Sequence, residues 1–191
     1  MGSKVHSAHP TGRGRAVIFT ETKLKGAFVI DIEPIEDERG LFARSWCREE
    51  FKARGLNSEL AQCNISFNNK KGTLRGMHYQ KPPHEEAKLV RCTQGAIFDV
   101  IIDLRPDSPT RTQWVGKELT AKNRKMFYIP EGFAHGFLTL EDDTEVFYQM
   151  STPYVPASAS GIRWNDPVFN INWPEQPKII SERDQSYPDF N

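Results

Sequence analysis

The residues best suited to proton-transfer chemistry lie together in one short part of the chain. Arg75, His78 and Lys88 are interleaved there with apolar residues such as Leu74 and Val90. This setting predicts partial burial, and buried cationic side chains are costly unless they are paired. A neutral imidazole can accept a proton near pH 7, and an ammonium group can stabilise a developing oxyanion. The segment is therefore a candidate catalytic site.

Each of these residues also has a structural explanation. Strict alternation along a strand would put Arg75 and His78 on opposite faces, unless Gly76 forms a bulge that brings both to one side. A histidine on a strand is commonly structural, and Lys88 could simply extend to the edge of a sheet. The residues alone leave both interpretations open.

A second stretch, rich in Pro and Gly, ends in His135 with a PxGxxH spacing that resembles the second metal-binding motif of cupins. A metal-dependent enzyme could use His78, His84, Glu85 and His135. However, five residues separate the first two histidines, and Gln80 stands where a second ligand would be needed. This spacing argues against a complete three- or four-ligand site. We therefore expect no metal.

Two further residues could take part in proton transfer. Tyr148 alternates with apolar residues on one face of an expected strand, so it is either a core residue or a proton donor. Asp166 precedes a proline, so it is either a turn residue or a carboxylate that orients an imidazole. The sequence does not decide between these roles.

Composition excludes several classes of protein. The chain has 191 residues with 25 basic and 25 acidic side chains, so no charge excess suggests nucleic acid as a partner. No apolar run approaches the roughly 20 residues of a membrane span. Three cysteines without CxxC spacing indicate neither disulfides nor zinc. We expect a soluble cytoplasmic protein in which residues 1–15 are a disordered leader or an expression remnant.

Short β-branched and aromatic segments, separated by turn residues, predict an all-β jelly-roll sandwich or barrel with a few short helices. We expect a helix over 48–54 and β-hairpins around the turns 68–72 and 94–95. The strand over 96–104 has the apolar character of a strand buried on both faces. We expect one domain over 16–191, in which the chain from 153 onward wraps the rest.

Motifs along most of the chain resemble those of the nucleotide-sugar 3,5-epimerases of the dTDP-4-dehydrorhamnose type. They are DERG (37–40), LRGMHYQ (74–80), KLVR (88–91), GAIFDVIIDLR (95–105), IPEGFAHGF (129–137), FYQMS (147–151) and GIRWNDP (161–167). The resemblance implies a cofactor-free cupin-type enzyme and a homodimer with exchanged N-terminal strands. Its substrate would be a nucleotide-diphosphate-linked 4-keto-6-deoxyhexose.

The resemblance also implies roles for individual residues. The catalytic set would be the base His78, its dyad partner Asp166, the enolate-stabilising Lys88 and the acid Tyr148. The substrate-binding set would be Arg39, Gln62, Arg75, His135 and Tyr154. In this set the two arginines would hold the diphosphate, Arg39 in the neighbouring subunit's site.

Two positions depart from the family pattern. Arg44 stands where a glutamate is common, and Cys63 stands where an aspartate is frequent. Both bear on which sugar or nucleotide is preferred. Competing hypotheses are a metal-dependent cupin isomerase or oxygenase, and a sugar-nucleotide-binding module without catalysis. The sequence does not distinguish inversion at C3, at C5 or at both.

Overall fold

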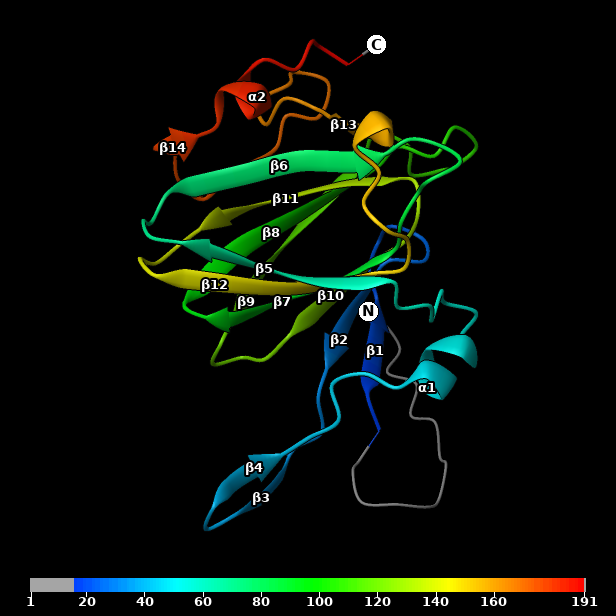
Figure 1. Cartoon of the computed structure of the whole chain (residues 1–191), viewed down its shortest axis with the longest axis vertical. Helices are drawn as coiled ribbons and strands as arrows, with labels where there is room; N and C mark the ends of the chain where they lie inside the picture. Colours follow the sequence, from blue (N-terminus) through cyan, green and yellow to red (C-terminus); the bar gives the residue numbers. More distant parts are fainter. Residues whose placement is uncertain (1–15, 191) are drawn as a thin grey trace.

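The structure is a computed structural model that describes residues 16–190, so the leader expected over 1–15 lies outside the described residues. Two six-stranded sheets face each other (Figure 1). The first has the order β1 (Ile18–Glu21), β2 (Phe28–Asp31), β10 (Met126–Ile129), β7 (Lys88–Gln94), β12 (Thr144–Met150), β5 (Gln62–Asn68). The second has the order β13 (Ala159–Gly161), β6 (Thr73–Gln80), β11 (Phe133–Thr139), β8 (Ala96–Asp103), β9 (Trp114–Thr120), with β14 (Ile179–Ile180) also paired to β6.

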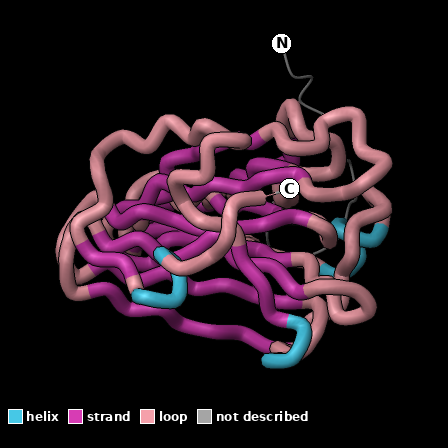
Figure 2. The backbone as a smooth tube through the Cα atoms, turned by 90° about the horizontal axis from the view of Figure 1, so that it is seen from above, coloured by secondary structure: helices cyan, strands magenta, loops and turns pink. Residues whose placement is uncertain are grey.

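The remaining elements are short and peripheral. They are the hairpin β3 (Ile35–Asp37) and β4 (Gly40–Phe42), the helices α1 (Arg48–Lys52) and α2 (Glu182–Gln185), and the 3-10 turn η1 (Pro156–Ser158). From above, the strands form stacked layers and the helices lie at the margin (Figure 2). The predicted all-β jelly roll is therefore confirmed. Within residues 16–190, no helix has the length and apolarity needed to cross a membrane; the expected cytoplasmic location stays a prediction.

The core fills the space between the two sheets. Val90, Phe127 and Val146 from the first sheet pack with Ile101 and Phe137 from the second, all of them 4% exposed or less. Burying each of these side chains contributes about 1.5–3 kcal/mol before entropy is considered. Strand β8 is buried along almost its whole length, as its apolar sequence predicts.

The two predicted hairpins are wrong. Strands β5 and β6 follow each other in sequence but belong to different sheets, and so do β7 and β8. The connecting turns carry Gly72 and Gly95 with φ of +82° and +74°. Such residues permit a tight reversal of the chain, but they do not determine whether the next strand pairs with its predecessor or crosses to the facing sheet.

Of the two alternatives for Arg75 and His78, the structure shows the one with a bulge at Gly76. His135 pairs with His78 and Phe137 pairs with Arg75, so β6 uses one residue more than β11 over this interval. A Cβ atom on Gly76 would lie 2.4 Å from the Cα of Gly136, and its φ is +142°. Only glycine fits this close approach of two strands. The extra residue brings Arg75 and His78 to the same cavity.

The C-terminal segment lies along β6, as Figure 1 shows for the orange and red part of the chain. β13 pairs with one half of β6 in antiparallel orientation, and β14 pairs with the other half in parallel orientation. Ser181 precedes α2, and its hydroxyl accepts a hydrogen bond from the backbone N–H of Asp184 (3.1 Å). This cap fixes the first turn of α2 next to β6.

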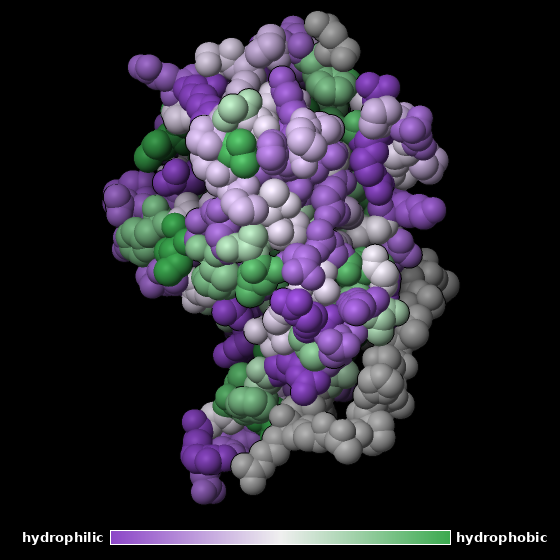
Figure 3. All heavy atoms as spheres, turned by 45° about the vertical axis from the view of Figure 1, so that its right-hand side comes forward, coloured by the Kyte–Doolittle hydropathy of each residue, from purple (hydrophilic) through white to green (hydrophobic). Residues whose placement is uncertain are grey.

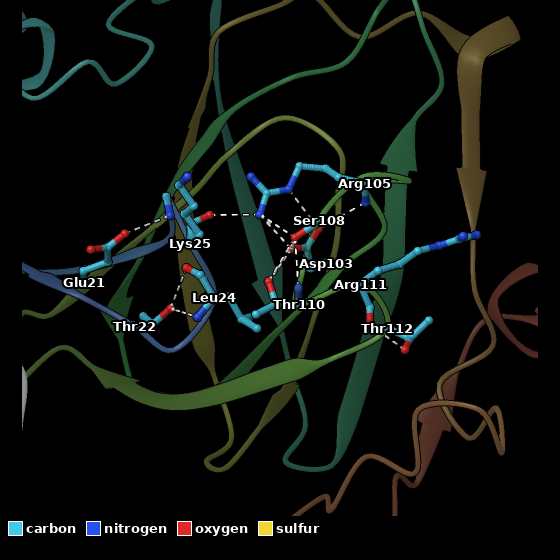
Figure 4. Close-up of polar contacts among 11 residues, drawn as sticks. Glu21, Thr22, Leu24, Lys25, Asp103, Arg105, Ser108, Thr110, Arg111 and Thr112 are labelled. Atoms are coloured by element: carbon cyan, nitrogen blue, oxygen red, sulfur yellow. Dashed lines mark hydrogen bonds and ion pairs between the residues drawn. The ribbon is translucent and has the colours of Figure 1, made fainter.

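A buried carboxylate joins the loop after β8 to the loop between β1 and β2 (Figure 4). Asp103 accepts hydrogen bonds from Arg105 Nη2 (2.7 Å), Ser108 Oγ (2.5 Å) and Thr110 Oγ1 (2.7 Å), and Arg105 also donates to the carbonyl of Lys25 (2.9 Å). Burial alone would raise the pKa of Asp103, but these donors outweigh it and lower the pKa to about 2. The stabilisation is present above the unfolded-state pKa and is lost as the pH falls toward 2.

We predict that Arg105→Ala destabilises the protein by about 3 kcal/mol, because it leaves the fully buried Asp103 carboxylate without its charged partner. Urea unfolding monitored by circular dichroism measures the loss. The control is Arg111→Ala in the same loop, whose exposed side chain points away from the cluster in Figure 4. Its unfolding free energy should change by less than about 0.5 kcal/mol. Equal effects in the two variants would show that the buried pair is not a main support of this loop.

Candidate active site

A cavity of about 540 Å³ opens between the two sheets. Its walls come from β5, β6, β7, β11 and β12 together with the C-terminal segment. Six of the nine residues predicted to form the site line it, and they are Arg75, His78, Lys88, His135, Tyr148 and Tyr154. This is the size and mixed polarity expected of a small-molecule site.

His78 is held by a carboxylate that the sequence interpretation missed. Its Nε2 lies 2.7 Å from Asp184 Oδ1, and the side chains are 42% and 6% exposed respectively. Burial raises the pKa of Asp184, but His78, the backbone N–H of Gly76 and Ser181 outweigh it, so the pKa lies below its usual value. The carboxylate is therefore ionised at neutral pH and can only accept. Nε2 must donate, which leaves Nδ1 as the nitrogen of the neutral ring that can take up a proton.

The predicted pairing of His78 with Asp166 is wrong. Asp166 is 2% exposed, and its two oxygens accept hydrogen bonds from the backbone N–H groups of Val168 (2.9 Å) and Phe190 (2.7 Å). These two hydrogen bonds fix the turn after Asp166 and the end of the chain near Phe190. The turn-residue alternative is the one that the structure supports.

A sequence signal for Asp184 exists, although it does not identify the partner. Ser181 after an apolar pair is typical of a helix N-cap, and it places Asp184 in the first turn of a helix. That the turn lies against His78, 106 positions earlier, follows only from the pairing of β14 with β6.

Lys88 is buried rather than extended to solvent. Its Nζ lies 2.9 Å from Glu86 Oε1, with the two side chains 9% and 4% exposed. His135 is held in a similar way, because its Nε2 lies 2.7 Å from Oδ1 of the fully buried Asp99. Burial raises the pKa of Asp99, while His135 and Lys88 oppose the shift. The cavity therefore contains an ammonium group and an imidazole that are both fixed by carboxylates.

Tyr148 lies on β12 and lines the cavity with Lys88 and His78. Burial raises its pKa; Arg75 lowers it, and Glu86 raises it further. The net direction is upward, so the phenol keeps its proton at neutral pH and can donate it.

Two arginines line the cavity. Arg75 is held through its Nε, which donates to Asn68 Oδ1 (2.7 Å). Arg183, which the sequence interpretation missed, lies close enough to the phenols of Tyr154 and Tyr187 for both to raise its pKa. Guanidinium groups suit phosphate oxygens because their planar donors match them at fixed geometry.

The other two predicted contacts lie outside the cavity lining. Gln62 Oε1 accepts a hydrogen bond from the backbone N–H of Tyr154 (2.7 Å), so Gln62 supports the loop that carries Tyr154. Arg39 lies in the exposed turn between β3 and β4, where it pairs with Asp37. Figure 1 shows this hairpin projecting from the sandwich.

The metal-site alternative requires three or more ligands in one place. In the part of the chain that the structure describes, no group of three His, Cys, Asp or Glu side chains is arranged to hold a metal ion. His78 and His135 instead face separate carboxylates, Asp184 and Asp99.

Comparison with known proteins identifies the family. The family model described as dTDP-4-dehydrorhamnose 3,5-epimerase matches residues 21–191. The chain is 41% identical to an enzyme of that name from Shigella flexneri over 86% of this chain and 91% of the relative. It superposes on the enzyme of that name from Elizabethkingia anophelis with a TM-score of 0.89 and 38% identity, covering 91% and 96% of the two chains. A Bacillus anthracis structure with TDP and PPi bound gives a TM-score of 0.88 and 39% identity, covering 92% and 100%. The chain therefore belongs to the dTDP-4-dehydrorhamnose 3,5-epimerase family.

Proposed function

We propose that this protein inverts C3, C5 or both in a nucleotide-diphosphate-linked 4-keto-6-deoxyhexose, by enolisation without a cofactor. The observation that carries the proposal is the His78–Asp184 pair at a cavity that also holds Lys88 and Tyr148. The set contains a base, an oxyanion-stabilising cation and an acid. Membership of the family and the TDP bound to a relative support the same substrate class.

The proposed reaction has two proton transfers at each carbon. The C4 ketone acidifies the neighbouring C–H bonds, and His78 Nδ1 takes the proton while the electron pair moves to O4. Asp184 holds the ring and stabilises the imidazolium that forms. Lys88 stabilises the enolate charge at O4, because a fixed ammonium is effective in a site shielded from water. The Tyr148 phenol then protonates the carbon from the opposite face, and the centre is inverted.

We assign the diphosphate to Arg75 and Arg183 at the cavity. Arg75 is positioned by its hydrogen bond to Asn68, and Arg183 lies beside the phenols of Tyr154 and Tyr187. Positioned donors lose less rotamer freedom when an anion binds. His135 and Tyr154 would complete the contacts to the sugar nucleotide.

The test is hydrogen exchange of nucleotide-linked 4-keto-6-deoxyglucose in deuterated buffer, followed by proton NMR. We predict that the enzyme replaces the C3 or C5 hydrogen, or both, with solvent deuterium, because enolisation exposes that carbon to solvent-derived protons. Loss of one signal would identify a single epimerisation and loss of both a double one. No exchange at either carbon would contradict the proposed function.

Matched aspartate variants serve as controls in the same assay. Asp184→Asn should lower the exchange rate by roughly 10²- to 10⁴-fold, because it removes the charge that orients His78. Asp166→Asn should leave exchange per folded molecule within about twofold of the unchanged enzyme, because the carboxylate of Asp166 accepts hydrogen bonds from backbone N–H groups and not from His78. If Asp166→Asn lowered the exchange rate more than Asp184→Asn did, Asp166 would again be the candidate partner of His78.

We also propose a homodimer in which N-terminal strands, those of the β3–β4 hairpin, are exchanged, so that Arg39 acts at the other subunit's cavity. The support is the β3–β4 hairpin, which carries the exposed apolar side chains Ile35, Leu41 and Phe42. Figure 3 shows hydrophobic side chains gathered on this projection. Apolar groups on a projecting hairpin are typical of surfaces buried by another subunit.

Subunit complementation tests this arrangement. His78→Ala should be inactive because it lacks the base, and Arg39→Ala nearly inactive because it lacks a diphosphate contact. Unfolding and refolding the two variants together should restore about one quarter of the unmodified activity, because half of the dimers are mixed and each contains one intact site. If Arg39 acts within its own chain, a mixed dimer still contains one defective site of each kind, and no activity returns.

A further inference from the structure

Glu86 has one carboxylate oxygen for which the mechanism above provides no use. Its Oε1 holds Lys88 Nζ at 2.9 Å, whereas its Oε2 is buried and has no hydrogen-bond partner among residues 16–190. Glu86 is 7% exposed and lines the cavity. A buried charged oxygen is costly when it lacks a donor, so the ligand that fills the cavity is the expected source of one.

The neighbours of Glu86 do not supply that donor. Tyr148 is near enough for the carboxylate to raise its pKa, but it makes no hydrogen bond to Oε2. Lys88 is already engaged by Oε1. Among the described residues that line the cavity, the other buried side-chain oxygen without a partner is Ser66 Oγ, on the strand β5.

The ammonium and carboxylate together present a donor beside an acceptor. An α-hydroxy ketone presents the complementary pair, since its carbonyl oxygen accepts and its adjacent hydroxyl donates. In a 4-keto sugar these groups are O4 and the hydroxyl on C3. Lys88 is assigned to O4 in the proposed function. Glu86 forms an ion pair with Lys88, so it is the group best placed to accept a hydrogen bond from the adjacent hydroxyl.

We propose that Glu86 is a specificity-determining residue, whose Oε1 holds Lys88 and whose Oε2 accepts a hydrogen bond from the C3 hydroxyl of the sugar. This inference rests on the proposed function. It implies that the enzyme selects 4-keto sugars that carry a hydroxyl next to the ketone. A buried acceptor left unpaired by a substrate without that hydroxyl would penalise the substrate strongly.

The test compares nucleotide-linked 4-keto-6-deoxyglucose with its 3-deoxy analogue, using deuterium exchange at C3 and C5 as the readout for both. We expect the unmodified enzyme to prefer the hydroxylated substrate by at least about tenfold in kcat/KM, since hydrogen bonds to charged groups are the stronger ones. In Glu86→Gln, a single amide oxygen must serve both Lys88 and the hydroxyl. The preference should therefore fall by roughly tenfold.

The matched control is Glu85→Gln, the same change at the adjacent residue, which does not line the cavity. It should keep the full preference for the hydroxylated substrate. Circular dichroism and the affinity for dTDP check that Glu86→Gln folds and binds the nucleotide. The inference would be overturned if Glu86→Gln kept the full preference for the hydroxylated substrate, or if the unmodified enzyme showed no such preference. Absence of exchange with both substrates in the unmodified enzyme would instead overturn the proposed function.

Discussion

The hydrogen bond between His78 and Asp184 is the interaction on which the site depends. It joins the middle of β6 to a helical turn near the other end of the chain, 106 positions away. That turn can reach His78 only because β13 and β14 pair along β6. The ionised carboxylate then determines which ring nitrogen carries the proton, so the fold of the C-terminal segment sets the tautomer of the base.

Buried carboxylates also position other charged and titratable groups of the cavity. Lys88 and His135 are each held by a buried carboxylate, from Glu86 and Asp99. Keeping charged groups in a partly buried site costs desolvation free energy, and paired geometry offsets that cost. The sandwich core provides the rigidity that fixes these pairs. The cavity is therefore already organised for charge to develop on a bound substrate.

Local features of the fold could be predicted from the sequence, and long-range pairings could not. The helix near 48–54, the doubly buried strand β8 and the possibility of a bulge at Gly76 follow from residue types and spacing. The hairpins predicted at Gly72 and Gly95 were wrong, because a turn residue specifies that the chain reverses but not which sheet receives it. Which sheet the next strand joins depends on core packing between residues far apart in sequence.

The candidate site shows the same division. The clustered residues Arg75, His78 and Lys88 line the cavity, as the sequence suggested. The partner of His78 was misassigned, because Asp166 and Asp184 both lie in turns of the C-terminal segment. Only the register of β14 against β6 decides which carboxylate faces the imidazole.

The most direct test of the account is the tautomer of His78, read from imidazole nitrogen shifts in protein labelled with ¹⁵N-histidine. Signals absent from a His78→Gln variant give the assignment. We predict that the neutral ring carries its proton on Nε2, with Nδ1 unprotonated, and that Asp184→Asn weakens this preference. A neutral ring protonated on Nδ1, unaffected by Asp184→Asn, would contradict the assignment of Asp184 as the residue that orients the base.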